Sequence, residues 1–297
     1  MDKLLFTGGT GFLGNNIMPI LSNDYEVTTI GITSKDMIQS NLAKEVPSLP
    51  EHYDVVLHAC GKAHSVPKTE AEKQAFFDVN YQGTVNLCTA LEKAGVPKSF
   101  VFISTLSVYG TSVGVGIEET HPLDGMSPYA KSKIMAEEYL QKWAKKNDVL
   151  LSILRPSLMI GPNAPGNLGA MVNGIKKGRY FNVAHGNARK SLLMVYDIAN
   201  VLPKLVDKGG VYNICDDSQP SYAELSKLMC EQLGKKPPLS IPMWLAKPLA
   251  WIGDIIPNFP INTYRLKKLT QTCTYSNERI KRSLDLQPMN VLDNYKI

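Results

Sequence analysis

The chain has 297 residues, of which 44% are apolar and 20% charged, and its formal net charge is +5. This length suits one large α/β unit or two closely joined domains, and the absence of a dense basic run gives no support for nucleic-acid binding. The five cysteines are scattered and lack metal-ligand spacing, which predicts free thiols in a reducing compartment and no metal site. No apolar stretch has the length of a transmembrane helix and the N-terminus lacks a signal-peptide core, so we expect no membrane span and a cytoplasmic location.

The first predicted feature is a glycine-rich loop, Thr7 to Gly14, that follows a short apolar strand. Gly8 permits a tight turn, Gly11 lets the backbone approach a pyrophosphate, and Gly14 lets the next helix pack closely on the strand. The N–H groups at the start of that helix point at the phosphates. A glycine triplet is a weak signal alone, but its strand–loop–helix context favours a dinucleotide site over an ordinary turn.

The second predicted strand, Glu26 to Ile32, bears on the choice of dinucleotide. A site that prefers NAD usually has a carboxylate at the end of this strand, where it holds the ribose 2′-OH. The segment Ile30 to Lys35 has none. Ser34 and Lys35 are suited to a 2′-phosphate, or they are plain loop residues. The sequence therefore leans slightly to NADP over NAD.

Strands and helices then alternate along the chain. Ser127 and Pro128 are suited to begin the predicted helix that follows Asn80 to Ala94 in the chain. Strands that alternate with helices predict parallel βαβ units, and hence an α/β fold with a Rossmann-type doubly wound parallel sheet. The predicted strands are Tyr53 to Gly61, Ser99 to Thr105 and Val149 to Leu154, and the predicted helices are Asn80 to Ala94 and the one that starts at Pro128.

Beyond Gly161-Pro162 the residue composition of the chain changes. A loop over Asn163 to Gly169 is expected, the segment from about 190 to 216 is expected to return to the sheet as strands, and residues after Ser221 are mostly helical. We therefore predict a dinucleotide-binding domain over 1–162 plus about 190–216. A smaller, mostly helical substrate domain is predicted over 163–189 and 217–297.

The stretch 241–260 contains two tryptophans and several prolines. A helix lying on a membrane surface is one interpretation. Because its prolines interrupt the amphipathic pattern, a cap or lid of the substrate domain is preferred.

The residues that carry chemistry are Tyr129, Lys133 and Thr105. Tyr129 and Lys133 are four residues apart, so they share one face of the predicted helix. A nearby ammonium lowers the pKa of a tyrosine and makes it usable in proton transfer at a carbonyl or carbinol oxygen. Thr105 stands at the carboxyl end of its strand, which is the ligand edge of a parallel sheet, and is placed to bind the same substrate oxygen. A tyrosine and a lysine four residues apart are common in helices. Their combination with the glycine loop and Thr105 is what indicates a catalytic site.

With these residues in place, the sequence resembles the extended short-chain dehydrogenases/reductases of the NAD-dependent epimerase/dehydratase group. The motifs that carry the resemblance are Thr7 to Gly14, His58 to Gly61, Asn80 to Thr84, Ser104-Thr105 followed by Val108-Tyr109-Gly110, Tyr129 to Lys133, and Arg155-Pro156 with Gly161-Pro162. The resemblance implies that Thr105, Tyr129 and Lys133 are the catalytic set and that Asn80 is structural. It also implies a nucleotide-linked sugar as substrate, often changed at C4, and a homodimer formed through helices 80–94 and 128–146.

The resemblance also assigns the cofactor and substrate contacts. The predicted cofactor-binding residues are Gly8, Gly11, Phe12, Leu13, Gly14, Thr33, Ser34, Lys35, His58, Ala59, Cys60, Gly61, Tyr129, Lys133 and Pro156. Thr105, with Arg189 or Lys190, is expected to bind substrate. One of these two cations would pair with the substrate diphosphate, although a solvated basic pair is nearly as good an interpretation. The segments Arg189 to Leu193 and His58 to His64 look like bacterial 4-reductases and 4-epimerases of surface-polysaccharide pathways.

Two departures narrow the choice within the family. Leu106-Ser107 stands where 4,6-dehydratases carry Asp-Glu, which argues against a dehydratase, and Leu158 stands where many 4-epimerases carry Asn. The sequence therefore predicts first an NAD(P)-dependent 4-keto reductase of a nucleotide sugar, and second a 4-epimerase with the same residues. A non-catalytic dinucleotide-binding sensor is the third interpretation, and the retained tyrosine and lysine argue against it.

Overall fold

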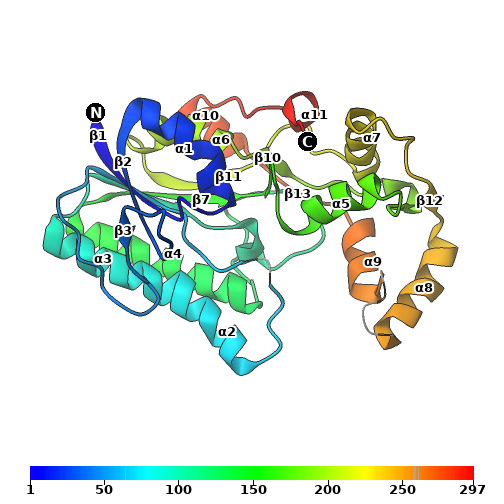
Figure 1. Cartoon of the computed structure of the whole chain (residues 1–297), viewed down its shortest axis with the longest axis horizontal. Coiled ribbons are helices and arrows are strands. Elements are labelled where there is room, and N and C mark those ends of the chain that lie inside the picture. Colours follow the sequence, from blue (N-terminus) through cyan, green and yellow to red (C-terminus); the bar gives the residue numbers. More distant parts are fainter. Residues whose placement is uncertain (64, 257–258, 260) are drawn as a thin grey trace.

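The computed structural model describes residues 1–63, 65–256, 259 and 261–297 (Figure 1). His64, and residues 257, 258 and 260 of the predicted lid, lie outside the described residues. In the described part, a seven-stranded sheet has the order β11-β7-β5-β4-β1-β2-β3, with every neighbouring pair parallel. This confirms the predicted Rossmann-type fold. The strands are β1 (Asp2–Thr7), β2 (Tyr25–Gly31), β3 (Ile38–Gln39), β4 (Val55–His58), β5 (Ser99–Ile103), β7 (Leu150–Pro156) and β11 (Gly210–Ile214).

The direction of winding reverses between β1 and β4, and this reversal positions the site. From β1 the chain proceeds outward through β2 and β3, whereas β4, β5, β7 and β11 continue on the other side. Thr7 at the end of β1 is paired with His58 at the end of β4. Ligands of open parallel sheets bind where the carboxyl ends of two such strands diverge. The glycine loop and the loop after His58 therefore border the expected binding crevice.

Helices cover both faces of the sheet (Figure 1). On one face the apolar side chains of α1, α6 and α10 form a core with those of β1, β4 and β11. On the other face α3 and α4 pack on the sheet around aromatic residues such as Phe100 and Trp143. These helices are α1 (Phe12–Asp24), α3 (Gly83–Ala94), α4 (Pro128–Asn147), α6 (Asp197–Leu205) and α10 (Glu278–Leu284).

One helix in this half was not predicted. Helix α2 (Glu70–Phe77) buries only Phe76, so it offers no apolar periodicity. Its start is marked by a capping box, in which Thr69 and Glu72 each bind the other's backbone N–H. It continues through a π-helical turn, Asp78–Gln82, into α3. The predicted helix began at Asn80, within this turn.

The C-terminal half adds small two-stranded sheets and further helices. Helix α5 begins at Gly166, inside the segment predicted as a loop, because Leu168, Met171 and Ile175 bury one face. The three strand pairs are β8 (Leu158–Ile160) with β10 (Leu192–Met194), β9 (Asn182–Val183) with β12 (Ser240–Ile241), and β6 (Gly114–Ile117) with β13 (Cys273–Tyr275). The helices are α5 (Gly166–Lys176), α7 (Tyr222–Gln232), α8 (Met243–Ile255), α9 (Thr263–Thr270) and α11 (Val291–Asn294). No helix among the described residues is both long and apolar enough to cross a membrane.

The division into two domains stays a prediction. Of the segment expected to return to the sheet, β11 joins the seven strands, whereas β10 pairs with β8 outside it. Ile280, Leu284 and Leu286, which were assigned to the substrate domain, lie in the core beneath α1 and α6. The last helices therefore pack partly with the sheet.

Candidate active site

The glycine loop has the geometry that a pyrophosphate requires. Gly8 has φ +85°, and a Cβ there would lie 2.9 Å from the backbone nitrogen of Cys60. A Cβ on Gly14 would collide with the backbone of Gly9. Gly11 is the N-cap of α1 and supplies no side-chain cap, and the first turn holds no acidic residue. The N–H groups of this turn are thus left without a side-chain acceptor, which suits an anionic ligand.

His58 was predicted to bind cofactor, but its side chain is fully buried below the site. Nδ1 lies 2.7 Å from Oγ1 of Thr7, and Nε2 lies 3.0 Å from Oγ1 of Thr84. The Thr7 hydroxyl already accepts from the N–H groups of Ala59 and Cys60, so it donates to Nδ1. The Thr84 hydroxyl donates to a backbone carbonyl and therefore accepts from Nε2–H. Burial lowers the pKa of His58 to about 3, so the ring is neutral and holds the two strand ends together.

Asn80 fixes the loop that follows β4. Its side-chain oxygen accepts from the N–H of Lys62 at 2.7 Å, and its nitrogen donates to the Lys62 carbonyl at 3.1 Å and to Oγ of Ser132 at 2.9 Å. Ser132 lies on α4 between the two predicted catalytic residues. The buried amide thus ties the loop that carries Gly61 to the helix that carries Tyr129, which is the structural role that the resemblance implies.

Thr105 and Tyr129 are brought together by β5 and α4. Thr105 follows β5 directly, and its Oγ1 accepts from the N–H of Ser107 at 3.1 Å. Ser127 caps α4 by accepting from the N–H of Ala130 at 3.1 Å, and the helix presents Tyr129 from its first turn. The Thr105 side chain lies near the Tyr129 phenol. Burial raises the pKa of the Tyr129 phenol, and the nearby Thr105 side chain partly offsets the shift.

Lys133 lies one turn further along α4 and is almost fully buried. Its Nζ donates to the carbonyl of Ile103 at 2.8 Å and lies 4.4 Å from the ring centre of Phe102. Burial lowers its pKa to about 8, although Glu137 acts in the opposite direction. The expectation that Lys133 lowers the pKa of Tyr129 is not met in this structure. The ammonium is bound to the strand, and burial dominates the titration of the phenol.

A buried ion pair beneath these residues was missed by the sequence analysis. Arg155 binds Glu137 through two nitrogens, at 3.1 and 2.6 Å, and donates to the Tyr109 hydroxyl at 2.9 Å. Ser104 donates to the same carboxylate, and Tyr109 donates to Asn213 at 2.6 Å. Glu137 is one turn beyond Lys133 and Ser104 directly precedes Thr105. The network therefore holds the backbone of both catalytic elements in place.

The loop after β2 contains a carboxylate, Asp36, directly after the segment Ile30 to Lys35 on which the choice of dinucleotide was based. Asp36 folds back against Gly31, where a Cβ would lie 2.6 Å from Oδ2. This oxygen accepts from the N–H of Thr33 at 3.0 Å and from its hydroxyl at 2.7 Å. Oδ1 is buried and has no hydrogen-bond partner among the described residues. Ser34 and Lys35 are exposed beside it.

A second unpartnered oxygen marks the end of β7. Pro156, a predicted cofactor residue, is the last residue of β7 and is buried. The next residue, Ser157, has a buried Oγ that lacks a partner in the described part of the chain. Buried oxygens without partners are costly, so Asp36 and Ser157 are positions where a ligand donor would be accommodated. Nothing in the sequence around Ser157 indicates that its hydroxyl is buried without a partner.

Of the two cations predicted at the diphosphate, the structure favours Lys190. Arg189 is already paired with Glu224, with Nη1 at 3.2 Å from the carboxylate, and donates to the Gln219 carbonyl at 3.1 Å. Lys190 is half-buried, and its pKa is lowered by burial and by nearby Lys268 of α9. Two lysines held close together favour an anionic ligand between them. Lys268 was not predicted, because it lies 78 positions further along the chain.

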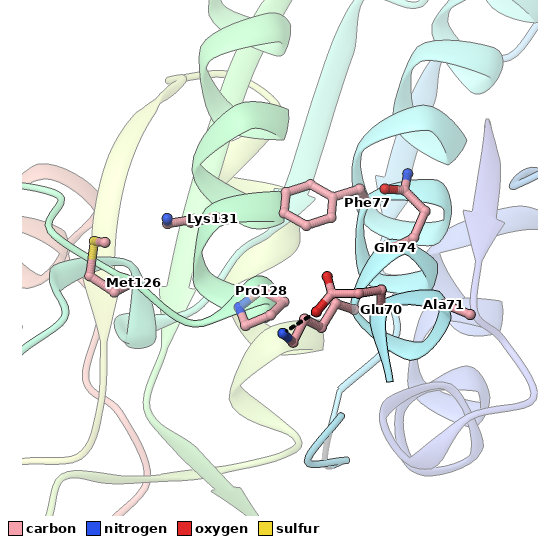
Figure 2. Close-up of a pocket in the computed structure, with 8 residues that line it drawn as sticks. Glu70, Ala71, Gln74, Phe77, Met126, Pro128 and Lys131 are labelled. Carbon is pink, nitrogen blue, oxygen red and sulfur yellow. Dashed lines mark hydrogen bonds and ion pairs between the residues drawn. The ribbon is translucent and has the colours of Figure 1, made fainter. Parts of the chain in front are cut away.

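A groove of about 600 Å³ lies between α2 and the start of α4, the helix that carries Tyr129 and Lys133 (Figure 2). It is lined from α2 by residues such as Phe77 and from the start of α4 by Pro128 and Lys131. The ion pair between Lys73 and Glu70, at 2.6 Å, lies at its edge. None of the three predicted catalytic residues lines it. The groove is therefore a surface feature next to the site and not the site itself.

The comparisons with known proteins agree with this arrangement. The chain is 29% identical to the N-acetyl-alpha-D-glucosaminyl-diphospho-ditrans,octacis-undecaprenol 4-epimerase of Escherichia coli O157:H7, over 95% of this chain and 89% of that protein. It is 26% identical to the GDP-6-deoxy-D-mannose reductase of Pseudomonas aeruginosa, over 77% and 80%. The structure of RMD from Pseudomonas aeruginosa complexed with NADPH superposes with a TM-score of 0.76, at 21% identity over 98% of this chain and 95% of that one. That likeness confirms the fold.

The model of the NAD dependent epimerase/dehydratase family matches residues 4–215, which span both the glycine loop and the predicted catalytic residues. The predicted resemblance is confirmed, and so is the NAD(P)-dependent character of the enzyme. The chain belongs to the NAD dependent epimerase/dehydratase family, within the extended short-chain dehydrogenases/reductases.

Proposed function

We propose that the protein is a 4-epimerase that acts on a sugar carried on a diphosphate. The observation that carries this proposal is the placement of Thr105, directly after β5, near Tyr129 in the first turn of α4, with Lys133 one turn further along that helix. The pair stands beside a glycine loop that fits a dinucleotide. A phenol beside a threonine hydroxyl is suited to exchange a proton with a sugar oxygen through its phenol and phenolate forms.

Each residue has one task. Tyr129, as the phenolate, takes the proton of the sugar hydroxyl as C4 is oxidised, and as the resulting phenol it returns that proton when the carbonyl is reduced. Thr105 holds the same oxygen and keeps it within reach of the phenol. Lys133, whose pKa is lowered to about 8 by burial, is predicted to bind the cofactor ribose. When bound, the nicotinamide cofactor supplies reversible hydride transfer at C4.

The 4-keto reductase is the second candidate, since the same three residues serve both reactions. The relative that matches 95% of the chain is a 4-epimerase, which favours epimerisation. The reductase that is 26% identical to this chain favours 4-keto reduction. The absence of acidic residues at Leu106-Ser107 argues against elimination in either case.

The carrier beyond the diphosphate differs among relatives. The reductase acts on a GDP-linked sugar, whereas the 4-epimerase acts on a sugar diphosphate of undecaprenol, so the diphosphate is what their substrates share. Lys190, with Lys268 nearby, is our candidate for binding it. A homodimer formed through α3 and α4 stays a prediction.

Product analysis separates the two reactions. Purified protein is incubated with UDP- and dTDP-linked sugars and with a polyprenyl-diphosphate sugar, and the products are followed by NMR. Interconversion of 4-epimers without added cofactor is the result we expect. Net consumption of NAD(P)H with a 4-keto sugar, without interconversion, would assign the protein as a reductase instead.

Asp36 is expected to make NAD the preferred cofactor, which reverses the slight lean to NADP drawn from residues 30–35. An ionised carboxylate at the end of β2 accepts from the ribose 2′-OH and repels a 2′-phosphate. We therefore expect Asp36→Ser to shift the ratio of NAD to NADP affinity by about tenfold or more toward NADP. Titration of protein fluorescence with each dinucleotide measures this ratio. Asp54→Ser is the matched control, because this carboxylate accepts from Lys3 N–H, at the opposite end of the sheet. An unchanged ratio in Asp36→Ser would remove Asp36 from the cofactor site.

A further inference from the structure

Helix α8 presents a broad apolar face to solvent. Trp244, Trp251 and Ile255 are 75%, 71% and 82% exposed. They are separated by seven and four residues, so they share one face of the helix. The remaining tryptophan, Trp143, is buried on α4. Scattered exposed apolar residues are ordinary, but a contiguous face with two tryptophans marks an interaction surface.

The opposite face of α8 anchors it to the protein. Ala246 and Ala250 are buried and pack with Leu266 of α9 and with Val183. The helix runs from Met243 to Ile255 and passes through Pro248 without a break. The prolines therefore do not interrupt the amphipathic pattern, which had been the argument against a membrane-surface helix. The apolar face is turned away from the side that α8 uses for packing.

The net positive charge of the chain is concentrated in the segment that contains this helix. Residues 235–270 contain six basic residues and one acidic residue, and the rest of the chain is neutral overall. Lys247 of α8 and Lys267 of α9 are exposed. Lys268 lies over the ring of Tyr264, at 4.5 Å from its centre. Aromatic and apolar side chains bordered by lysines are the composition of helices that lie on anionic lipid surfaces.

We propose that α8 and α9 dock the protein on the surface of an anionic lipid bilayer, with Trp244 and Trp251 in the headgroup region. Tryptophan is suited to this position because its ring is apolar and its N–H is polar. A second copy of the chain is a poor occupant, because it would bring a second set of lysines against the first. A bilayer with anionic headgroups complements both the apolar face and the charge.

Docking also identifies the substrate carrier, and this step rests on the proposed function. Lys190 is bridged to Cys273, three residues beyond the end of α9, and the Arg189 N–H donates to Oγ1 of Thr272 at 3.1 Å. The predicted diphosphate site thus lies next to the chain that leaves the docking helices. These helices stand at the end of the molecule opposite β1 (Figure 1). A diphosphate bound there is close to the bilayer surface, so we infer that its sugar is carried by a membrane lipid.

Vesicle flotation tests the docking. The full-length protein is mixed with vesicles of phosphatidylethanolamine and phosphatidylglycerol, or of phosphatidylcholine alone, at low and high salt. We expect binding to the anionic vesicles that weakens with salt, and a blue shift of tryptophan emission. The variant Trp244→Ser/Trp251→Ser should lower the partition coefficient at least about tenfold. The control Val66→Ser/Val115→Ser removes two side chains that are 85% and 82% exposed elsewhere, and should bind like the parent.

The docking proposal is overturned if the parent fails to float with anionic vesicles, or if the double tryptophan variant floats equally well. Loss of a dimer in that variant by light scattering, without vesicle binding in the parent, would assign the face to a protein contact. The carrier is judged separately, by turnover of a polyprenyl-diphosphate sugar in vesicles and of soluble UDP-sugars. Turnover of UDP-sugars alone overturns the lipid carrier and leaves the proposed function intact. Turnover of neither substrate class overturns the proposed function, whatever flotation shows.

Discussion

Replacing Tyr129 by phenylalanine is expected to lower kcat by about 10²–10⁴-fold, the usual contribution of a positioned acid–base group. The loss corresponds to roughly 3–5 kcal/mol of transition-state stabilisation. The variant keeps the ring, which contacts Phe76 with centroids 6.2 Å apart, and removes only the hydroxyl, which lies near Thr105. Cofactor affinity should therefore be nearly unchanged. Steady-state turnover and a dinucleotide titration measure the two effects independently.

Tyr139→Phe is the matched control for this experiment. Tyr139 lies on the same helix and makes an edge contact with Tyr81, with centroids 6.2 Å apart, on the side of α3. We expect its loss of a hydroxyl to leave turnover within about twofold of the parent. If Tyr129→Phe behaved in the same way as this control, the phenol would have no part in proton transfer. A fall in cofactor affinity that accounts for the lost turnover would instead make Tyr129 a binding residue.

Removing one partner of the buried Glu137–Arg155 pair is expected to destabilise the protein by about 3–5 kcal/mol, because the remaining charge is left in the core. In Glu137→Gln, Arg155 keeps only the Tyr109 hydroxyl and one amide oxygen as acceptors. Urea unfolding measures the change in the free energy of unfolding. Turnover should fall as well, because Ser104 and Lys133 flank the pair.

Two further variants make this result specific. Glu70→Gln breaks the exposed pair with Lys73 and should leave stability unchanged within error, since exposed ion pairs contribute little. The double variant Glu137→Leu/Arg155→Met replaces both charges by apolar groups and should recover most of the lost stability. A Glu137→Gln variant as stable as the parent would contradict the account of the pair as a buried, fully bonded unit.

Local patterns in the sequence predicted the sheet, which the structure confirms, and named the catalytic candidates, which stay a prediction. Thr105 and Tyr129 were identified because one ends an apolar strand and the other opens a capped helix, and both features are readable over a few residues. Gly8 and Gly14 were assigned their roles in the same way, and the backbone contacts bear these roles out. In each case the residue's function follows from its own position in one element.

Features that depend on contacts between distant segments were missed or misjudged. The Glu137–Arg155 pair joins a helix to a strand, and Lys268 comes to Lys190 from the far end of the chain. The resemblance assigned His58 to the cofactor site through the motif His58 to Gly61, and the structure shows its ring turned inward to two threonines. The pattern of a strand does not say which way its last side chain points.

The most direct test of hydride transfer at C4 uses a diphosphate-linked sugar that carries deuterium on that carbon. In the proposed reaction the hydride removed from C4 is held in the site and returned to the same carbon, while Tyr129 handles only the proton of the oxygen. NMR and mass spectrometry of the epimerised product should therefore show the deuterium retained at C4, with no incorporation of solvent hydrogen. Product formed with loss of the label to water would contradict hydride transfer and, with it, the roles assigned to Thr105, Tyr129 and Lys133.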